Sequence, residues 1–367
     1  MRILMAESRA TLSNWRTPPF SGWAFHHVRE LIPTAGIAAG HGGARALDTA
    51  PRALDLEEFH GRSASDGFIV VHRGAVVHAH YAQGMGEHDP HILMSVSKAM
   101  LGLLASRVPE LEPERQIAEY VPEVAATAWR GARVRDVLDM RVGIAFDENY
   151  LASAGPIIEY RKATGWNPLA PGETASDLLT FCRQLRAGEG PHGGPVHYVS
   201  PNSDLLGIAI ERATGRRYAE LMSERVWRPA GARTSAYITL DRLGAARAAG
   251  GLCATLCDLA RVGLWMLATQ QAFCEDLERN GDAQAWAAGD MAAYFPRRPM
   301  RYRSYWYVLD GAAPLVFGYG IHGQWLFLDR RNELVIAKLS SQALPMDPAL
   351  IALTLETVER IRAELAA

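Results

Sequence analysis

One apolar stretch, residues 93–105, most constrains how this chain of 367 residues can fold. It reads Leu93-Met94-Ser95-Val96-Ser97-Lys98-Ala99-Met100 and continues with Leu101, Leu103, Leu104 and Ala105. A helix of this composition is apolar all round, which is typical of a helix buried inside a protein or a membrane. Lys98 interrupts the apolar run, which is also too short to span a bilayer. The sequence therefore predicts a helix in the protein interior.

Ser95 and Lys98 lie three residues apart at the start of this helix. Residues at i and i+3 share a helix face, so the hydroxyl and the amine can point into the same small space. Burial lowers the pKa of a lysine, and a neutral lysine can accept the proton of a serine hydroxyl. The chain has only three lysines, and neither Lys162 nor Lys338 has a serine three residues before it. We therefore interpret Ser95 as a nucleophile and Lys98 as its base.

Composition and charge exclude several classes of partner. With 38 basic and 40 acidic side chains the formal net charge is −2, so no nucleic acid or other polyanion is expected to bind. Residues 1–13 mix charges with short apolar pieces and lack the pattern of a signal peptide, and no run of about twenty apolar residues occurs. We expect a cytoplasmic protein of one large or two moderate domains, without a membrane segment.

The cysteines support neither a disulfide framework nor a metal centre. Four cysteines in a chain of this size do not indicate a disulfide scaffold. Cys253 and Cys257 are four residues apart, as zinc ligands can be, but no nearby pair of histidines or cysteines completes a tetrahedral set. We therefore predict that the protein uses no metal and no cofactor.

The order of expected elements divides the chain into an N-terminal arm and two domains. Residues 1–50 are rich in proline, glycine and tryptophan without a sustained period, and we expect an extended arm packed on the body. Strand-like runs lie near both ends of the remaining chain, with mostly helical residues between them. This order predicts an α/β (α+β) fold with an antiparallel sheet built from both chain ends and flanked by helices. Residues 51–107 and 216–367 would form the sheet domain and residues 108–215 a mainly helical domain, with the active site between them.

The individual elements follow from hydrophobic period and from turn and cap residues. The predicted strands are 68–71 and 75–81, joined by a hairpin turn at Arg73-Gly74, and 305–308, 315–319, 324–328 and 334–339. The predicted helices are 134–140, 176–185 with Ser176 and Asp177 as cap residues, one capped by Ser203 that stops at Gly215, 255–267 and 347–363.

A serine hydrolase also needs a group that carries a proton to the leaving atom. The sequence has no G-x-S-x-G, which excludes the nucleophile elbow of the α/β-hydrolases. Tyr198 is the best candidate for the proton carrier, because it follows a glycine-rich loop, 188–195, and precedes a predicted helix. A phenol beside a lysine ammonium has a lowered pKa, so we expect Tyr198 to act as a base together with Lys98.

The combination of Ser95-Val96-Ser97-Lys98 with Tyr198-Val199-Ser200 resembles the serine β-lactamase and penicillin-binding protein superfamily, in the Y-x-S/N form of class C enzymes and related esterases. Further matches along nearly the whole chain resemble the 6-aminohexanoate-dimer (nylon-oligomer) hydrolase branch of that superfamily: 23–25, 93–98, 137–140, 198–207, 258–263 and 320–324. The third motif of the superfamily, K-T-G, is absent, and a strand at 317–324 stands in its place. The resemblance implies a β-lactamase/transpeptidase-like fold.

The same resemblance implies roles for residues around the nucleophile. It places the oxyanion hole at the backbone N–H groups of Ser95 and Ile321. The acidic residue that helps the nylon enzymes hold an amino-terminal substrate is replaced in this chain near Arg161. The residues to which the resemblance assigns substrate contact are Tyr150, Arg161 and His322. The residues expected to support the site through hydrogen bonds are Ser97, Ser200 and Asn202.

These residues predict a serine hydrolase that forms an acyl-enzyme from small carboxylic esters, with 6-aminohexanoate-type linear amides as a further candidate class. Two other functions stay open. The missing K-T-G, whose cation normally meets a substrate carboxylate, argues against a β-lactamase or D-amino-acid peptidase. The presence of Ser95, Lys98 and Tyr198 argues against a non-catalytic binding protein on the same scaffold. Loops 143–166 and 272–303 are expected to set specificity, and a homodimer is one candidate assembly.

Overall fold

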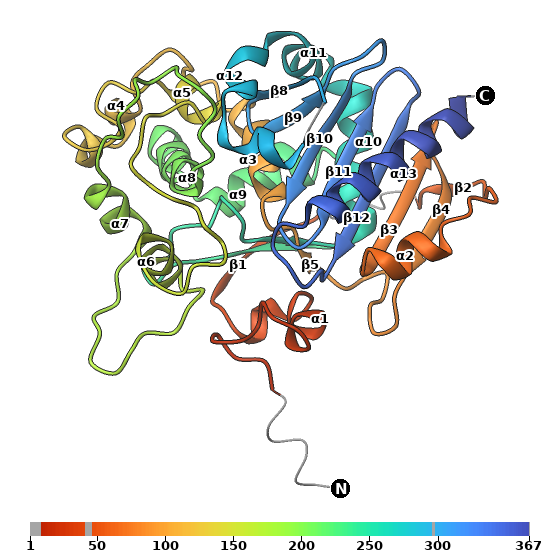
Figure 1. The fold of residues 1–367 in the computed structure, drawn as a ribbon, viewed down its shortest axis with the longest axis horizontal. Coiled ribbons are helices and arrows are strands. Elements are labelled where there is room, and N and C mark those ends of the chain that lie inside the picture. Colours follow the sequence, from red (N-terminus) through yellow and green to blue (C-terminus); the bar gives the residue numbers. More distant parts are fainter. Residues whose placement is uncertain (1–8, 41–45, 296–297, 367) are drawn as a thin grey trace, which may run out of the picture.

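An eight-stranded sheet forms the centre of the fold, and its strands come from both ends of the chain (Figure 1). The computed structural model describes residues 9–40, 46–295 and 298–366. In spatial order the strands are β2 (Asp48–Thr49), β4 (Ala75–Tyr81), β3 (Ser65–His72), β12 (Leu334–Ser340), β11 (Gln324–Asp329), β10 (Leu315–Gly320), β9 (Trp306–Leu309) and β8 (Met300–Arg303). Every neighbouring pair is antiparallel except β2 and β4. The predicted antiparallel sheet from both chain ends is confirmed.

All six predicted strands are present, with ends that differ by up to three residues from the expected ones. The predicted hairpin turn joins β3 to β4, and Arg73 and Gly74 have φ angles of 50° and 79°. Two successive positive φ angles match the turn type that suits the right-handed twist of a hairpin. The edge strands β2 and β8 were not predicted. Residues 1–8 and 41–45 of the predicted arm, and 296–297 of a predicted specificity loop, lie outside the described residues.

Helices cover both faces of the large sheet, so its central strands are buried on both sides. Every residue of β10, β11 and β12 is buried. The helices α3 (Val96–Ala105) and α10 (Leu256–Thr269) pack on one face, and α2 (Glu57–Arg62) and α13 (Pro348–Ala366) lie on the other (Figure 1). All ten residues of α3 are buried, which confirms the predicted interior helix.

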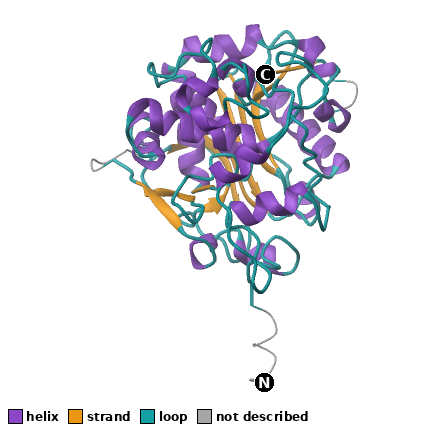
Figure 2. Cartoon of the chain, turned by 90° about the vertical axis from the view of Figure 1, so that its left-hand side faces the viewer, coloured by secondary structure: helices purple, strands orange, loops and turns teal. Residues whose placement is uncertain are grey.

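Most of the remaining helices form a layer at one end of the sheet, which faces the viewer in Figure 2. They are α4 (Ile117–Tyr120), η2 (Pro122–Val124), α5 (Val134–Leu138), α6 (Pro156–Ala163), α7 (Leu178–Gln184), α8 (Ser200–Thr214), α9 (Tyr218–Met222) and η3 (Ser223–Trp227). Asp177 caps α7 by accepting a hydrogen bond from the N–H of Thr180, and α8 ends at Gly215, as predicted. The predicted Ser203 cap is wrong: α8 begins at Ser200 because Pro201 fits the first helical turn. No helix among the described residues has the length and apolar character needed to cross a bilayer.

A second sheet, which the sequence analysis did not predict, joins the N-terminal arm to the body. Its four short strands are, in spatial order, β1 (Thr34–Ile37), β6 (Ala236–Thr239), β7 (Leu252–Ala254) and β5 (His91–Ile92). The described part of the arm also contains α1 (Phe20–Ala24) and η1 (Val28–Glu30). Trp15 and Phe25 of the arm are buried in one apolar cluster with Met94 and Trp166. The arm therefore packs against the residues that precede Ser95.

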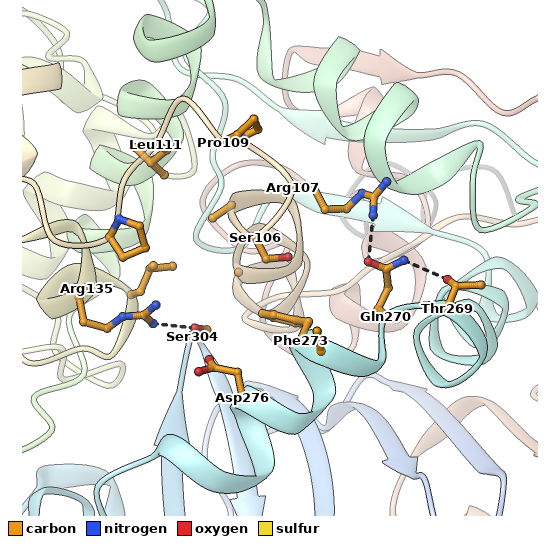
Figure 3. Close-up of a pocket in the computed structure, with 15 residues that line it drawn as sticks. Ser106, Arg107, Pro109, Leu111, Arg135, Thr269, Gln270, Phe273, Asp276 and Ser304 are labelled. Atoms are coloured by element: carbon orange, nitrogen blue, oxygen red, sulfur yellow. Dashed lines mark hydrogen bonds between the residues drawn. The ribbon is translucent and has the colours of Figure 1, made fainter.

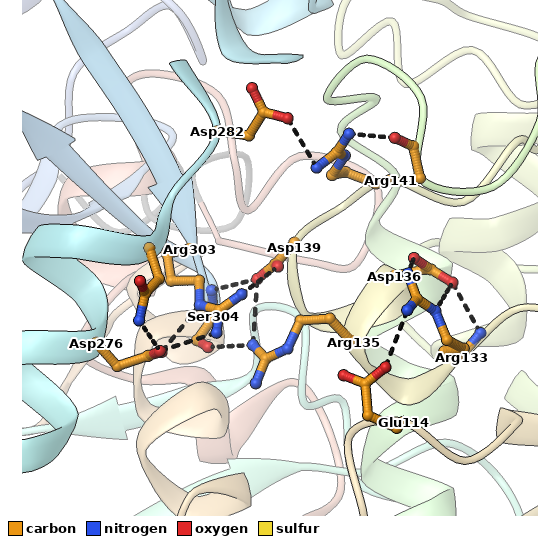
Figure 4. Close-up of polar contacts among 12 residues, drawn as sticks. Glu114, Arg133, Arg135, Asp136, Asp139, Arg141, Asp276, Asp282, Arg303 and Ser304 are labelled. Atoms are coloured by element: carbon orange, nitrogen blue, oxygen red, sulfur yellow. Dashed lines mark hydrogen bonds and ion pairs between the residues drawn. The ribbon is translucent and has the colours of Figure 1, made fainter. Parts of the chain in front are cut away.

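An ion-pair network joins the helical layer to the edge of the large sheet (Figure 4). Asp139, which follows α5, pairs with Arg303 of β8 at 3.0 Å and with Arg135 at 3.4 Å. Arg303 also pairs with Asp276 at 2.8 Å, and the N–H of Ser304 donates to Asp139. The network thus connects α5, β8 and α11 (Gln271–Asn280), the helix that carries Asp276. After α11 the chain continues through α12 (Ala283–Ala287) and η4 (Asp290–Tyr294).

Candidate active site

Ser95 lies in a sharp turn between β5 and α3. Met94, the preceding residue, has a φ angle of 45°, which is unusual for a residue other than glycine and places strain next to a functional position. Residues 91–94 and 96–105 are buried, whereas Ser95 is partly accessible. The turn therefore exposes one serine hydroxyl in an otherwise buried segment.

Lys98 lies one helical turn further on and contacts Ser95 directly. Its Nζ is 2.8 Å from the Oγ of Ser95 and 2.8 Å from the carbonyl oxygen of Ala249. Burial lowers the pKa of Lys98 to about 7, although the carboxylates of Glu148 and Asp204 act in the opposite direction. At this pKa a substantial fraction of Lys98 is neutral near pH 7 and can accept a proton. The structure thus brings the predicted nucleophile and base together.

A buried ion pair fixes the segment that supplies the second partner of Lys98. The Asp204 carboxylate pairs with the Arg247 guanidinium and accepts hydrogen bonds from the hydroxyl of Tyr160 and the N–H of Ala249. Because Ala249 is held in this way, its carbonyl faces Lys98. Sequence reasoning did not single out Asp204, Arg247 or Tyr160, because these residues are separated by tens of positions and match no short motif.

Tyr198 lies beside Lys98, with the Nζ of the lysine 4.9 Å from the centroid of the phenol ring. The predicted lowering of its pKa is wrong. Burial raises the pKa of Tyr198 well above its ordinary value, and the nearby Glu148 carboxylate adds to this effect, whereas interaction with Ser95 only partly opposes it. Tyr198 is therefore a neutral phenol at physiological pH, and its hydroxyl can donate a proton.

Glu148 connects two residues named in the sequence analysis. Its carboxylate accepts hydrogen bonds from the N–H and hydroxyl of Ser200 and from the hydroxyl of Tyr150, at 2.9 Å for Tyr150. Ser200 thus has a supporting role in the structure, two residues after Tyr198. Glu148 itself was missed, because nothing in the sequence distinguishes it among 40 acidic residues.

Ser97 and Asn202 also form structural hydrogen bonds. The Oγ of Ser97 accepts from the N–H of Leu252 at 3.1 Å, which holds α3 against β7. The Oδ1 of Asn202 accepts from the indole N–H of Trp129 at 2.8 Å. Both side chains are buried, so they stabilise the surroundings of the site.

A tight turn at Ile321, His322 and Gly323 lies against Ser95. The expected strand at 317–324 is in fact two strands, β10 and β11, joined by this turn, in which His322 and Gly323 have φ angles of 61° and 86°. A Cβ atom at Gly320 would lie 2.9 Å from the backbone nitrogen of Ser95. Only glycine lets the end of β10 approach the Ser95 N–H so closely, which is the approach that an oxyanion hole at Ser95 and Ile321 requires.

His322 and Arg161, which the sequence analysis named for substrate contact, differ in their surroundings. The His322 ring is buried against Phe25, and its Nδ1–H donates to the carbonyl of Gln342 at 2.7 Å. These contacts correct the expectation for His322, because they give its side chain a packing role inside the turn. Arg161 as a whole is partly accessible, and its guanidinium donates to the carbonyl of Tyr150 at 2.9 Å.

A cavity of about 430 Å³ opens beside Tyr198, and Glu148, Tyr150, Tyr294 and Met346 line it. A second cavity, of about 570 Å³, lies around Ser106 at the other end of α3 (Figure 3). A ten-residue helix is roughly 15 Å long, so this second cavity is separate from Ser95. Among the described residues, no three histidine, cysteine, aspartate or glutamate side chains are placed to hold a metal ion.

Comparison with known proteins agrees with this geometry. Residues 48–358 match the beta-lactamase family. The chain belongs to this family. Within the beta-lactamase superfamily, the 6-aminohexanoate-dimer hydrolase of Paenarthrobacter ureafaciens is 34% identical over 354 residues, which cover 92% of this chain and 89% of that protein. The resemblance inferred from the motif residues is confirmed, and the chain is a hydrolase related to 6-aminohexanoate-dimer hydrolase.

Solved structures share the beta-lactamase fold with this chain. A Bacillus anthracis protein provisionally assigned as a 6-aminohexanoate-dimer hydrolase has a TM-score of 0.88 at 22% identity, with 98% of each chain covered. A beta-lactamase/D-alanine carboxypeptidase from Yersinia pestis, complexed with citrate, has a TM-score of 0.65 at 14% identity, covering 85% of this chain and 96% of that one. EstCE1, a hydrolase with promiscuous acyltransferase activity, has a TM-score of 0.62 at 16% identity, covering 83% and 96%.

Proposed function

We propose that this chain is a serine hydrolase in which Ser95 forms an acyl-enzyme with carboxylic esters and with linear amides of the 6-aminohexanoate type. The observation that carries the proposal is the 2.8 Å contact between the Oγ of Ser95 and the Nζ of Lys98. A serine hydroxyl is a weak nucleophile unless a base removes its proton, and a buried lysine with a pKa of about 7 is such a base at this distance.

The first step is attack of the Ser95 Oγ on the substrate carbonyl while Lys98 accepts the hydroxyl proton. The N–H groups of Ser95 and Ile321 would stabilise the negative charge that develops on the carbonyl oxygen. Tyr198, a neutral phenol, donates its proton to the leaving alcohol or amine, and Lys98 returns a proton to the phenolate. The bond between the carbonyl carbon and the leaving atom breaks, and the acyl group stays on Ser95.

In the second step, water replaces the leaving group. The same pair of residues removes a proton from the attacking water molecule and returns one to the Oγ of Ser95 as the acyl bond breaks. The carboxylic acid leaves, and the enzyme returns to its starting state. The buried surroundings of Lys98 and Tyr198 support this role, because they keep Tyr198 neutral and make a substantial fraction of Lys98 neutral near pH 7.

The amide class rests on the relative from Paenarthrobacter ureafaciens, and the ester class rests on the acyl-enzyme chemistry of Ser95 and Lys98. Esters and 6-aminohexanoate-type amides differ in the leaving atom, and one acyl-enzyme mechanism serves both. A cytoplasmic location, a homodimer and the absence of nucleic-acid binding remain predictions from the sequence.

The test is hydrolysis of p-nitrophenyl acetate, p-nitrophenyl butyrate and the 6-aminohexanoate linear dimer by wild type and Ser95→Ala. We expect turnover of at least the esters, no turnover by Ser95→Ala, and covalent labelling of wild type alone by a fluorophosphonate. Ser106→Ala, which removes a hydroxyl at the other end of the same helix, is the matched control and should keep its activity. Labelling or full turnover of Ser95→Ala would disprove the assignment of the nucleophile.

The pH profile provides a second test. Lys98 must be neutral to accept a proton, and its pKa is about 7. We therefore expect kcat/KM for p-nitrophenyl butyrate to fall about tenfold for each pH unit below about 7. A profile that stays flat down to pH 5 would exclude Lys98 as the base.

A further inference from the structure

Two arginines near the candidate active site have no carboxylate partner among the described residues. Arg16, in the N-terminal arm, donates to the Oδ1 of Asn167 at 2.5 Å. Arg161, at the end of α6, donates to the carbonyl of Tyr150. Both partners are neutral groups, so neither guanidinium forms an ion pair through these hydrogen bonds. Arginines in such partly buried positions usually pair with a carboxylate or another anion.

One turn of the chain, at the end of α6, holds the Arg16 guanidinium close to the backbone of Arg161. The carbonyl of Arg161 accepts hydrogen bonds from the N–H groups of Trp166 and Asn167, at 2.8 and 3.1 Å. Asn167 then binds Arg16 through its side chain, and the indole N–H of Trp15 donates to the carbonyl of Trp166 at 3.1 Å. These hydrogen bonds therefore attach the arm, next to Arg16, to the end of α6, next to Arg161.

This turn lies next to the reacting groups. Trp166 belongs to the same apolar cluster as Met94, which directly precedes Ser95, and Ile321 packs against that cluster. A Cβ atom at Gly250 would lie 3.3 Å from the Trp166 ring and 3.8 Å from the backbone of Met94. The Arg16 guanidinium carbon is 5.9 Å from the centroid of the same Trp166 ring.

The electrostatic surroundings agree with a missing anion. Burial, with the added repulsion of Arg161 and Arg247, lowers the pKa of Arg16 to about 9. Arg247 already has Asp204 as its partner. The nearby Glu148 carboxylate raises the pKa of Arg161 and offsets part of the positive charge, but its hydrogen bonds go to Ser200 and Tyr150 and not to either arginine.

The buried ring of His322 is a further titratable group that both arginines influence. Burial lowers its pKa to about 4, so the ring is neutral at physiological pH and adds no charge of either sign. The described groups around Arg16 and Arg161 therefore leave a local excess of positive charge beside the turn that carries Ile321. A bound anion would reduce the cost of burying two like charges together.

We propose that the guanidinium groups of Arg16 and Arg161 form an anion subsite that binds a carboxylate carried by the substrate. The subsite rests on the proposed function, since it assigns a preference to the same hydrolytic site. Guanidinium groups match carboxylates in shape and donate charge-assisted hydrogen bonds to them. The carboxylate can belong to the acyl group or to the leaving group, and the enzyme then favours anionic substrates over neutral ones of the same size.

The test compares anionic and neutral esters in two matched pairs. For a carboxylate on the acyl side, mono-p-nitrophenyl adipate is compared with its methyl ester. For a carboxylate on the leaving group, 4-acetoxybenzoate is compared with its methyl ester. In wild type, we expect kcat/KM for the anionic member to exceed that for the neutral member by about tenfold in one of the pairs, which identifies the source of the carboxylate.

The variants Arg16→Gln and Arg161→Gln should each lower this anionic-to-neutral ratio by about tenfold, and Arg161→Lys should restore part of it. Arg29→Gln is the matched control, because Arg29 lies in the same arm and stacks on Tyr237, and its ratio should equal that of wild type. The use of a ratio separates charge recognition from any loosening of Tyr150, which would lower both rates together.

Three outcomes distinguish the two proposals. If neutral esters are cleaved but neither ratio exceeds one, or if the ratio is unchanged in both glutamine variants, the anion subsite is wrong and the proposed function stands. If the anionic-to-neutral ratio falls in the glutamine variants as expected, both the proposed function and the anion subsite stand. If wild type cleaves no ester, the proposed function fails, and calorimetric binding of hexanoate to wild type, Arg16→Gln and Arg161→Gln decides the subsite alone: weaker binding by both variants supports it, and equal binding overturns it.

Discussion

The Glu148 carboxylate binds both the backbone N–H and the hydroxyl of Ser200, two residues beyond Tyr198. The same carboxylate raises the pKa of the buried Lys98 amine, which burial lowers. Glu148 thus combines two effects: it holds the start of α8, which follows the proton donor, and it adjusts the charge state of the base.

Glu148→Gln should shift the acid limb of kcat/KM to lower pH. Without the carboxylate, the pKa of Lys98 falls further below about 7, so neutral lysine persists in more acidic solution. We also expect kcat at pH 8 to fall by about tenfold, because the amide holds Ser200 less strongly. Glu159→Gln, which removes an exposed carboxylate paired with Lys162, is the control. An unchanged acid limb in Glu148→Gln would refute the electrostatic role.

Gly320→Ala should block the approach of β10 to the nucleophile. The new methyl group would lie 2.7 Å from the carbonyl oxygen of Leu93 and 2.9 Å from the nitrogen of Ser95, so one of the two segments must move. If the N–H of Ser95 is an oxyanion donor, we expect kcat for p-nitrophenyl butyrate to fall by about a hundredfold. Gly311→Ala, where a Cβ atom meets nothing within 4 Å, should leave kcat unchanged. Equal activity of the two variants would place the oxyanion hole elsewhere.

Three histidines at the edge of the large sheet should make the fold sensitive to acid. The ring of His60 stacks on His80 at 4.0 Å, and its Nε2 is 3.1 Å from the Nε2 of His78. Burial and the two neighbouring rings lower the pKa of His60 to about 3, well below the value of about 6.5 expected in an unfolded chain.

The unfolded state therefore binds more protons than the folded state between these two pKa values. The contribution of His60 to stability is complete above pH 6.5 and is lost as the pH falls toward 3. In urea titrations, we expect His60→Gln to lose about 1 kcal/mol less stability than wild type between pH 7 and pH 5. Parallel losses in the two proteins would show that the cluster does not control acid sensitivity.

Asp139→Asn should weaken the connection between the helical layer and the large sheet. It leaves Arg135 and Arg303 without their shared carboxylate in a mostly buried position, and we expect a loss of about 3 kcal/mol in the free energy of unfolding. Glu114→Gln breaks an exposed pair with Arg133 and should cost under about 1 kcal/mol. Chemical denaturation measures both. Similar losses in the free energy of unfolding would show that the buried network stabilises the fold no more than an exposed ion pair does.

The sequence was sufficient to predict the central helix and the main sheet, because both have strong local signals. The ten buried residues of α3 form a continuous apolar run, and the long strands β3, β4 and β12 alternate or cluster β-branched residues. The second sheet escaped prediction because its strands have only two to four residues, too few to establish a period.

Within the candidate site, spacing rules could predict only contacts between residues close together in the sequence. Ser95 and Lys98 are three residues apart on one helix, so their contact follows from local geometry. Glu148 acts through Ser200, which is 52 residues away, and no spacing rule reaches that far. The error over Tyr198 is also physical: a sequence shows which charges can be close, but it does not show that burial outweighs them.

The second sheet also determines how much of the chain must be synthesised before the turn at Ser95 can form. The strand that leads to Ser95, β5, is held by the carbonyl of Phe25 on one side and by β7 on the other. Because β7 spans Leu252–Ala254, a ribosome has to synthesise these residues before the turn at Ser95 can close. A prematurely terminated chain that lacks them would therefore display the serine without the framework that orients it, and only later stages of translation would give a reactive product.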